Sequence, residues 1–547
     1  AGFIETRSTT LSLVDGTDLR MGSAGGAAGQ LRLTAGSMTV GTAPVGNVAN
    51  PGAPMVSSTA LGQALGGADL KLETLASLGG NGDMTVQGAL NWNTRSAVKL
   101  VSAGALTLKS DVAGTAAASS LDALAATQIR LEGSELRAGN VFIESPTLRL
   151  SAVNTPVTAG QPATVSTARV NGGSVVLRGQ DVLMDNAQVS SQGDLSVDMM
   201  SGAQTVAGTT TVRGGSSLSA SAALRMRSDV MSVRADASAG ATRPLLRGEI
   251  VDIVGESKLW VEQAKIEGGT GTLRLAAGAN AGEIRLGAGA EVTGRTVELN
   301  GPNIVMSALQ SSTDATLTPG TVATLSSVGT APAVLSPSGS VTMVGTRIDL
   351  ADARVESGTA LRLLTPGSPN CTGGGCDPLL HIGPGNTVRA GTTLEFSSSQ
   401  PQSRLIMDDQ RYPQGGLTVA NATRLGAAST VTSSGTATIG AAEVDIQAAQ
   451  IRSTQGRLDL GSFGTSSANC ATTGAATCPA QVRLGAQTVL ATGAPQGAAT
   501  GLEVSVSAEQ LRLDDVLRRR SFDANGLING TSTEAGTAGP LVQAQGP

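Results

Sequence analysis

Short apolar–polar–apolar triplets recur along the whole chain. Residues 273–275 (Leu-Arg-Leu) and 297–299 (Val-Glu-Leu) are typical, with an apolar residue on each side of a charged one. Because side chains alternate between the two faces of a β-strand, each triplet places its apolar pair on one face and its central residue on the other. A strand this short buries very little alone, so the pattern predicts many copies that stack on one another.

The spacing of the triplets predicts the repeat. Two runs each open three successive triplets or near-triplets, at Val175, Val182, Leu195 and at Val341, Ile348, Leu361. In both runs the steps are about seven and about thirteen residues, and their sum of roughly 20 is typical of a solenoid. The apolar spacing of an amphipathic helix is missing almost everywhere. The sequence therefore predicts an all-β fold, a single elongated parallel β-helix with about 20 residues per coil and inserted surface loops.

The central residues of the triplets are expected on the outside of this solenoid. They alternate in sign and therefore predict a solvated face. The residues concerned are Arg32, Arg130, Arg149, Arg274, Arg285, Glu298 and Asp349.

Segments that break the period predict loops at the coil corners, where solenoids tolerate insertions. We expect one rod over residues 1–520, followed at 521–547 by a C-terminal tail or the start of a further segment. The expected loops lie at about 41–67, 112–127, 154–168, 310–339, 365–387, 397–416 and 464–481. Within 112–127, the alanine-rich residues 120–126 suggest a short helix. No segment has the features of a domain linker, because the triplets resume directly after each loop.

Composition excludes several classes of protein. The 547 residues are 40% hydrophobic but only 1% aromatic, which leaves a narrow aliphatic core and no bulky globular one. A net charge of −5 predicts neither nucleic-acid binding nor strong attraction to membranes. No apolar run is long enough for a transmembrane helix. The chain starts without the features of a signal peptide, so we expect a mature or excised piece of something longer.

The four cysteines form two local pairs in loops rich in small residues, Cys371 with Cys376 and Cys470 with Cys478. This spacing predicts two small loop-closing disulfides and an oxidising compartment. A zinc site would need closer cysteines and more histidine than His381. The sequence therefore predicts no metal and no cofactor.

His381 is the only histidine, and no obvious catalytic partner stands near it in the sequence. We interpret it as a packed or solvated residue of a strand or loop, and we do not expect an enzyme. The alternative is a carbohydrate-active β-helix enzyme, a polysaccharide lyase or glycosidase, which would need carboxylates or basic residues aligned over several coils.

Two acidic clusters and one basic run are the remaining candidates for chemistry. Asp408 and Asp409, with Arg411 and Tyr412, form the best local cluster, and the pair at 514–515 is the next. We interpret both as solvated turns. The three arginines at 518–520 are interpreted as a solvated terminal cap.

The triplets, the period near 20 and the Ala, Gly, Ser and Thr background resemble the filamentous-haemagglutinin type of secreted exoprotein. The opening residues 1–6 (Ala-Gly-Phe-Ile-Glu-Thr) are similar to a Gly-Gly-Phe-Val/Ile-Glu-Thr-Ser phrase common in that family. The resemblance implies a right-handed β-helical rod that is exported by two-partner secretion through an outer-membrane transporter. The family's secretion domain carries Asn-Pro-Asn motifs, which are absent here, so the chain resembles the rod and not the export signal.

The resemblance also implies a place and a set of partners. We expect a protein secreted to the bacterial cell surface, where it serves adhesion or aggregation. The expected partners are the secretion transporter, glycans or proteins on host or neighbouring cells, and other copies of the chain in a fibre.

Overall fold

The computed structural model describes most of the chain. The described residues are 3–9, 11–13, 17, 29–42, 55–155, 164–200, 208–235, 242–279, 282–311, 325–328, 331–366, 378–398, 400, 403–412, 426–463, 480–493, 503–522 and 528–544. They are mostly β-strand, with one α-helix, α1 (Ser58–Ala64), and one short 3-10 helix, η1 (Ala76–Leu78). None of the helices among them is long and apolar enough to cross a membrane.

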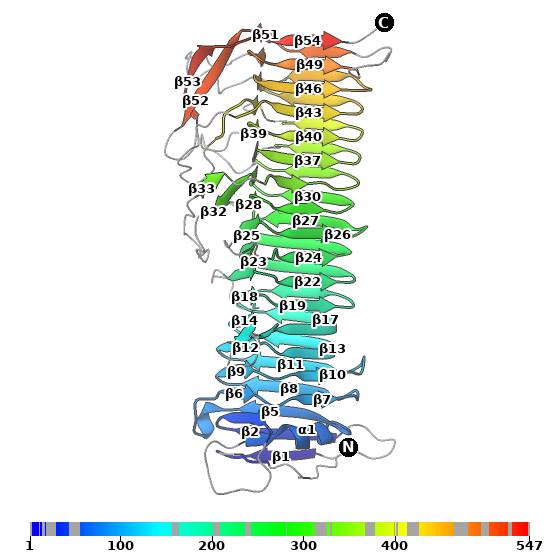
Figure 1. Cartoon of the computed structure of the whole chain (residues 1–547), viewed down its shortest axis with the longest axis vertical. Coiled ribbons are helices and arrows are strands. Elements are labelled where there is room, and N and C mark those ends of the chain that lie inside the picture. Colours follow the sequence, from blue (N-terminus) through cyan, green and yellow to red (C-terminus); the bar gives the residue numbers. More distant parts are fainter. Residues whose placement is uncertain are drawn as a thin grey trace. The chain divides into compact units, whose positions relative to one another are not determined.

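The chain divides into two compact units, unit 1 (Ala1–Glu249) and unit 2 (Ile250–Pro547). Within each unit, parallel strands stack coil upon coil into a solenoid (Figure 1). We name its three strand stacks faces A, B and C, in the order in which the chain visits them.

The strands of unit 1 fall into these faces as follows. Face A contains β1 (Phe3–Arg7), β2 (Gly29–Ala35), β5 (Ala68–Thr74), β8 (Ala97–Ser102), β11 (Ser120–Ala125), the second halves of β13 (Glu135–Glu144) and β17 (Arg169–Arg178), β20 (Leu195–Asp198) and the first half of β23 (Ala223–Arg234). Face B contains β3 (Met38–Gly41), β4 (Met55–Ser57), β6 (Met84–Val86), β9 (Ala105–Leu108), β12 (Gln128–Glu132), β14 (Thr147–Ser151), β18 (Asp181–Asp185), β21 (Thr209–Arg213) and the second half of β23. Face C contains β7 (Leu90–Trp92), β10 (Val112–Gly114), the first halves of β13 and β17, β19 (Gln188–Ser191), β22 (Ser217–Ala220) and β24 (Leu245–Gly248).

Unit 2 repeats the arrangement. Face A contains the first half of β25 (Ile250–Glu262), β27 (Thr272–Ala277), β30 (Thr296–Asn300), β35 (Val341–Val344), β38 (Leu361–Leu364), β41 (Leu394–Ser397), β44 (Ala437–Ala441), β47 (Leu458–Ser462) and β50 (Val504–Ser507). Face B contains the second half of β25, β28 (Glu283–Leu286), β31 (Asn303–Ser307), β36 (Arg347–Ala351), β39 (Leu379–Ile382), β42 (Arg404–Met407), β45 (Glu443–Ile446), β48 (Gln481–Leu484) and β51 (Gln510–Leu513). Face C contains β26 (Lys265–Gly268), β29 (Glu291–Thr293), β34 (Ala333–Leu335), β37 (Ala353–Ser357), β40 (Thr387–Ala390), β43 (Ser429–Ser433), β46 (Ala449–Ser453), β49 (Val489–Thr492) and β54 (Leu541–Ala544).

The strand register confirms the predicted parallel β-solenoid and its period. Val175 pairs with Leu195, and Val341 pairs with Leu361, each one coil and 20 residues later. Apolar residues therefore stack on apolar residues along the inside of each unit. Val297 and Leu299 are completely buried, as are their counterparts in most coils. Removal of this apolar surface from water is the main force that holds the coils together.

The corner between faces B and C is a tight turn that places one residue in the left-handed region of φ. Glycine adopts this conformation without strain, and asparagine adopts it more readily than most residues. Here other residue types are used as well, because the stacked coils fix the turn. The corner residues with positive φ are Gly133, Asn186 and Gly214 in unit 1, and Gln263, Gly289, Asp352, Gly385, Ala448 and Gln487 in unit 2.

Three antiparallel hairpins in the described residues all leave the solenoid at this same corner. They are β15–β16 (Val153–Thr155 and Thr164–Ser166), β32–β33 (Leu309–Ser311 and Leu325–Val328) and β52–β53 (Val516–Phe522 and Ile528–Ala535). Each follows a face B strand and returns to a face C strand. In unit 2, β32–β33 and β52–β53 project on the same side (Figure 1). Insertions therefore collect beside face B.

The predicted loop with a helix at 112–127 is wrong. The segment contributes β10 to face C and β11 to face A, and β11 pairs with both β8 and β13. Leu121 and Ala123 point into the core and are fully buried. The ladder on both sides of β11 outweighs the helix propensity of alanine, which is only a weak preference. The described helix, α1, lies instead inside the predicted loop at 41–67, where the Ser57 side chain caps its first turn.

Other predicted loops contain coil strands. Segments 310–339, 365–387 and 397–416 include β34, β39 and β42 respectively, and 154–168 includes the hairpin β15–β16. Of 464–481, only the last two residues are described. The expected tail at 521–547 is also wrong in part, because β54 stacks on β49 and thereby adds a further strand to face C.

Candidate functional site

The outer side of face B in unit 2 is buried along a column from β25 to β45, contrary to the predicted solvated face. One residue per coil forms an in-register column there. The column runs through Trp260, Arg285, Val305, Asp349, His381, Ile406 and Asp445, and each is at most 4% exposed. Arg285 and Asp349 lie on the outer side as predicted, but the expectation that they are solvated is wrong, while Glu298 on face A is exposed as expected. Part of the difference arises because β52 docks on the outer side of face B.

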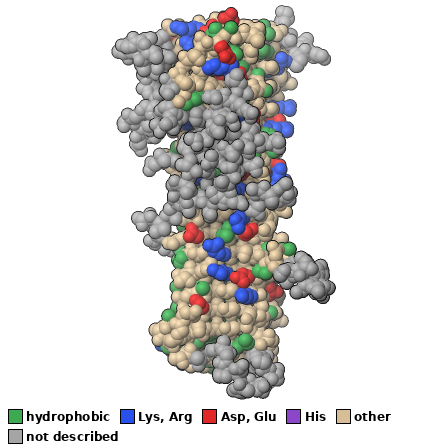
Figure 2. All heavy atoms as spheres, turned by 60° about the vertical axis from the view of Figure 1, so that its left-hand side comes forward, with side chains coloured by type: hydrophobic (Ala, Val, Ile, Leu, Met, Phe, Trp, Pro, Cys, Tyr) green, Lys and Arg blue, Asp and Glu red, His purple; other side chains and the backbone are tan. Residues whose placement is uncertain are grey.

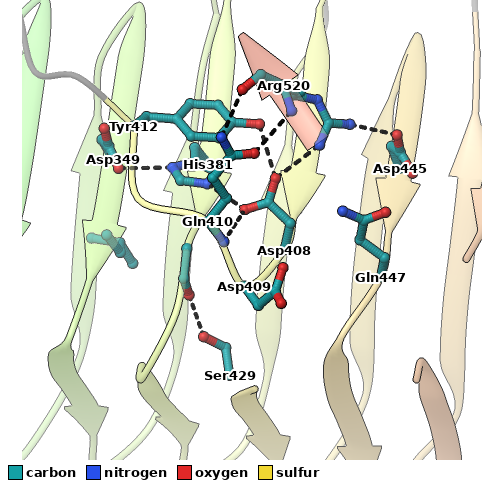
Figure 3. A network of polar contacts seen from close by, with 12 residues as sticks. Asp349, His381, Asp408, Asp409, Gln410, Tyr412, Ser429, Asp445, Gln447 and Arg520 are labelled. Atoms are coloured by element: carbon teal, nitrogen blue, oxygen red, sulfur yellow. Dashed lines mark hydrogen bonds and ion pairs between the residues drawn. The ribbon is translucent and has the colours of Figure 1, made fainter. Parts of the chain in front are cut away.

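His381 stands at the centre of the polar part of this column. Its ring Nδ1 lies 2.9 Å from Asp349 Oδ1, and its Nε2 lies 3.0 Å from Asp408 Oδ1. The ring of Tyr412 stacks on the imidazole at 3.5 Å between centroids (Figure 3). Burial alone would lower the pKa of His381, but the two carboxylates outweigh it and raise that pKa. The imidazole therefore serves as a buried cation that donates to both carboxylates.

Asp408 joins the histidine to the C-terminal hairpin. Its Oδ2 accepts hydrogen bonds from the Tyr412 hydroxyl at 3.0 Å and from Arg520 Nη1 at 2.8 Å. Burial would raise the pKa of Asp408, but the charges of His381 and Arg520 lower it. Burial raises the pKa of Tyr412 well above its usual value, so the phenol remains a neutral donor.

Asp445 receives both buried arginines of β52. Arg518 Nη1 donates to Asp445 Oδ1 at 2.6 Å, and Arg520 Nη2 donates to Oδ2 at 2.5 Å. Arg518 also pairs with Asp514, at 2.7 Å. Charge-assisted contacts of this kind are the stronger hydrogen bonds in proteins.

Two glutamine side chains complete the contact. Each amide hydrogen-bonds to the backbone of β52 in the way that the backbone of a neighbouring strand would. Gln447 Nε2 donates to the carbonyl of Arg518, and its Oε1 accepts from the Arg518 N–H, both at 2.7 Å. Gln410 makes the same pair of bonds with Arg520. We call these residues, with Asp349, His381, Asp408, Tyr412, Asp445, Arg518 and Arg520, the buried lock.

The charges of the buried lock balance. Asp349, Asp408 and Asp445 face the protonated His381 and the guanidinium groups of Arg518 and Arg520. A buried charge is tolerable only when it is paired in this way. The side chains of His381, Asp349 and Asp408 have no solvent-exposed surface. The arrangement is therefore suited to fastening the hairpin β52–β53 to face B.

The structure changes the interpretation of most sequence candidates. His381 is a packed strand residue, as predicted, but it has partners that sequence distance concealed. Asp408, Asp409 and Tyr412 are buried and not a solvated turn. The solvated cap at 518–520 is wrong for Arg518 and Arg520, while Arg519 turns outward and pairs with Asp409 and Glu534. Of the second acidic pair, Asp514 binds Arg518 and Asp515 is exposed.

The glutamines of the lock were not predicted, although their positions offered a signal. Each follows a face B strand by one to three residues, at the corner where the hairpins leave the solenoid. Two arginines two residues apart in β52 mark one face of a strand, which is the alternation that a docked hairpin requires. The four cysteines lie outside the described residues, so both disulfides stay predictions.

The described residues contain no group of three or more His, Cys, Asp or Glu placed to hold a metal ion. No protein-family model matches the sequence, and no curated protein matches it significantly. The resemblance described above therefore depends on the sequence pattern.

Proposed function

We propose that the chain is the rod portion of a secreted bacterial surface adhesin of the filamentous-haemagglutinin type. It would mediate adhesion or aggregation by displaying many loops, or it would assemble into extracellular fibres. The observation that carries this proposal is that the described hairpins all leave the solenoid at one of its three corners. In the described residues, antiparallel hairpins leave between faces B and C in both units, while the strands of all three faces continue as parallel ladders.

Such an arrangement supports multivalent display. Backbone ladders hold the coils in register, and the insertions supply separate contact points along each unit. Several weak contacts on one scaffold give an avidity far above the affinity of each one. In the space-filling view, positive and negative side chains are interspersed over unit 1, the lower part of the picture (Figure 2). A surface of mixed sign suits contacts made by particular loops and not by bulk charge.

The buried lock supports a mechanical role. It fastens β52 directly to the coils of β42 and β45, through Asp408 and Asp445, and Asp408 in turn binds His381 of β39. A repeat protein otherwise holds each coil only through its immediate neighbours. A fastening across several coils would oppose separation of the coils under load.

The same repeat character supports export through an outer-membrane transporter. Each coil needs only its neighbours to fold, so the chain would fold progressively as it emerges. We propose that transporter as a partner, with glycans or proteins of other cells as targets and the two cysteine pairs as disulfides outside the cell.

The alternative function, a carbohydrate-active enzyme, is weaker on present observations. The best assembled group of carboxylates and a histidine is the buried lock, which is sealed from solvent and internally neutralised. Retaining and inverting glycosidases need two accessible carboxyl groups that flank a bound sugar.

Beads coated with the purified chain test the proposal. We expect them to attach to cultured animal cells or to other bacteria under flow, and free chain should compete with them. Attachment no better than that of beads coated with an inert protein would contradict an adhesive function. Release of reducing ends from a panel of acidic and neutral polysaccharides would favour the enzyme instead.

A further inference from the structure

A pocket of about 480 Å³ lies in unit 1 at the corner between faces C and A. Its volume is within the range of about 300–1,000 Å³ that is typical of small-ligand sites. Its walls come from β10, β13, β17, β19 and the residues that follow β10 and β19. The main lining residues are Thr115, Arg137, Gly139, Asn171, Ser190 and Gln192. We call this site the corner pocket.

The corner pocket exists because its floor is made of glycine and its rim is held by hydrogen bonds. A Cβ on Gly139 would come within 1.9 Å of the Ala117 carbonyl oxygen, so only glycine fits there. The Ser119 hydroxyl donates to the Ala116 carbonyl at 2.6 Å and accepts from the Gly139 N–H at 3.0 Å. These bonds fix the rim against the floor, so the hollow is preformed.

Arg137 is the one charged residue that lines the corner pocket. It is exposed, and it makes no ion pair within the part of the chain that the structure describes. The neighbouring carboxylate of Glu135 is occupied by Asn171, whose Nδ2 donates to Glu135 Oε1 at 2.8 Å. The guanidinium is therefore free to meet an anion from outside.

The groups next to Arg137 are suited to hydroxyl partners. Arg137, Asn171 and Ser190 stand in register on three successive coils of face C. The Ser190 hydroxyl donates to Asn171 Oδ1 at 2.5 Å, which leaves its lone pairs available as acceptors. The exposed amide of Gln192 stands at the edge. The lining contains no aromatic residue on which a nucleobase could stack, and more of its surface is polar than apolar.

We propose that the corner pocket binds a carboxylate-bearing sugar residue within an acidic polysaccharide. Arg137 pairs with the sugar carboxylate, because the guanidinium fork matches a carboxylate in two parallel hydrogen bonds. Asn171, Ser190 and Gln192 hydrogen-bond to the ring hydroxyls. This inference rests on the proposed adhesive function and names the chemical class of one of its targets.

Calorimetric titration of the full chain with an oligogalacturonate tests the proposal. The wild-type chain should bind the oligosaccharide and should not bind its fully methyl-esterified form, which lacks the charge. Arg137→Gln should weaken binding about tenfold or more, the usual loss for a charged hydrogen-bonding partner. Gln192→Trp, which fills the hollow from an exposed position, should abolish binding. Arg169→Gln is the matched control, because Arg169 is exposed on β17 and does not line the pocket.

Three results would overturn the corner pocket: no binding by the wild-type chain, undiminished binding by Arg137→Gln, or an equal loss in Arg169→Gln. The bead assay keeps this test separate from that of the proposed function. If the beads attach but the chain does not bind the oligogalacturonate, the proposal for the corner pocket is contradicted and the adhesive function is still supported. If the beads do not attach but oligogalacturonate binding depends on Arg137, the adhesive function is contradicted and the proposal for the corner pocket is supported.

Discussion

The side-chain amide of Gln410 exchanges two hydrogen bonds with the backbone of Arg520, which lies 110 residues further along the chain. Gln447 holds Arg518 in the same way, and the backbone N–H of Ala486 donates to the carbonyl of Val516. Successive coils thus hold every second residue of β52. The strand crosses the coils instead of lying within one, and glutamine side chains supply the partners that its backbone would otherwise lack.

Gln447→Ala should loosen this strand. The variant leaves the buried N–H and carbonyl of Arg518 without partners, at a cost of about 1–3 kcal/mol. Hydrogen exchange across 516–522 should therefore accelerate markedly. Gln450→Ala, on the exposed side of β46, should leave that exchange unchanged. Equal exchange in Gln447→Ala and the wild type would show that the glutamine does not hold the strand.

Asp445→Asn should lower the free energy of unfolding far more than a similar change at the surface. The variant removes a negative charge that compensates the buried guanidinium groups of Arg518 and Arg520. Breaking a buried ion pair in this way costs about 3–5 kcal/mol. Asp459→Asn disrupts the exposed pair with Arg457, which solvent screens, so this variant should unfold close to the wild-type midpoint. Urea denaturation of both variants checks the contrast. Similar midpoints would mean that the lock contributes little.

The buried lock should also make stability depend on pH. The folded-state pKa of His381 is raised above its unfolded value of about 6.5, so its contribution is complete below that pH and is lost as pH rises through the folded pKa. The pKa of Asp408 is lowered, so its contribution is present above about pH 3.9 and is lost as pH falls through the folded pKa.

A pH series of denaturation curves measures the histidine effect, and His381 is the only histidine in the chain. The free-energy difference between the wild type and His381→Gln should be largest below about pH 6.5 and should shrink as the pH rises through the folded-state pKa. A difference that stays constant or grows with pH would contradict a protonated His381 in the lock.

The inward and outward positions of a triplet should respond very differently to truncation. Leu299→Ala removes a fully buried side chain from face A and should cost about 2–5 kcal/mol. Glu298→Ala, one residue earlier and exposed, should change stability by about 0.5 kcal/mol or less. Chemical denaturation of the two variants checks this. Comparable losses would mean that the strand face is assigned wrongly.

The cysteine pairs give a chemical prediction that is independent of the lock. Cys371 with Cys376, and Cys470 with Cys478, should resist alkylation in the secreted protein until a reductant is added. Mass spectrometry of peptides from each segment identifies the pairing. Alkylation of all four thiols without reduction would remove the predicted disulfides and their support for an oxidising compartment.

The triplets predicted the solenoid because every coil needs apolar residues at the same inward strand positions. The 20-residue spacing from Val175 to Leu195 is visible in the sequence and returns as a strand register. The strand at 120–125 was missed because two of its inward positions are alanine. Alanine is common in helices. The better signal was the spacing of Leu121 and Ala123, two apolar residues on either side of the polar Asp122.

The spacing of Arg518 and Arg520 gave a sign of a docked strand, but their partners in the buried lock could not be identified from the sequence. His381 and Asp349 are in register, but 32 residues separate them, because an insertion lengthens that coil. Insertions of unequal length spoil the count that would align them. Whether a central residue faces water also depends on what covers its face, and a triplet carries no information about that cover.

Cryo-electron microscopy of the full chain would show both the stacked coils and the buried lock. We expect parallel strands stacked at about 4.7–4.9 Å in each unit, with density for Arg518 and Arg520 running from β52 to Asp445 on face B. An antiparallel sandwich, or a hairpin β52–β53 standing away from face B with His381 open to solvent, would contradict this expectation.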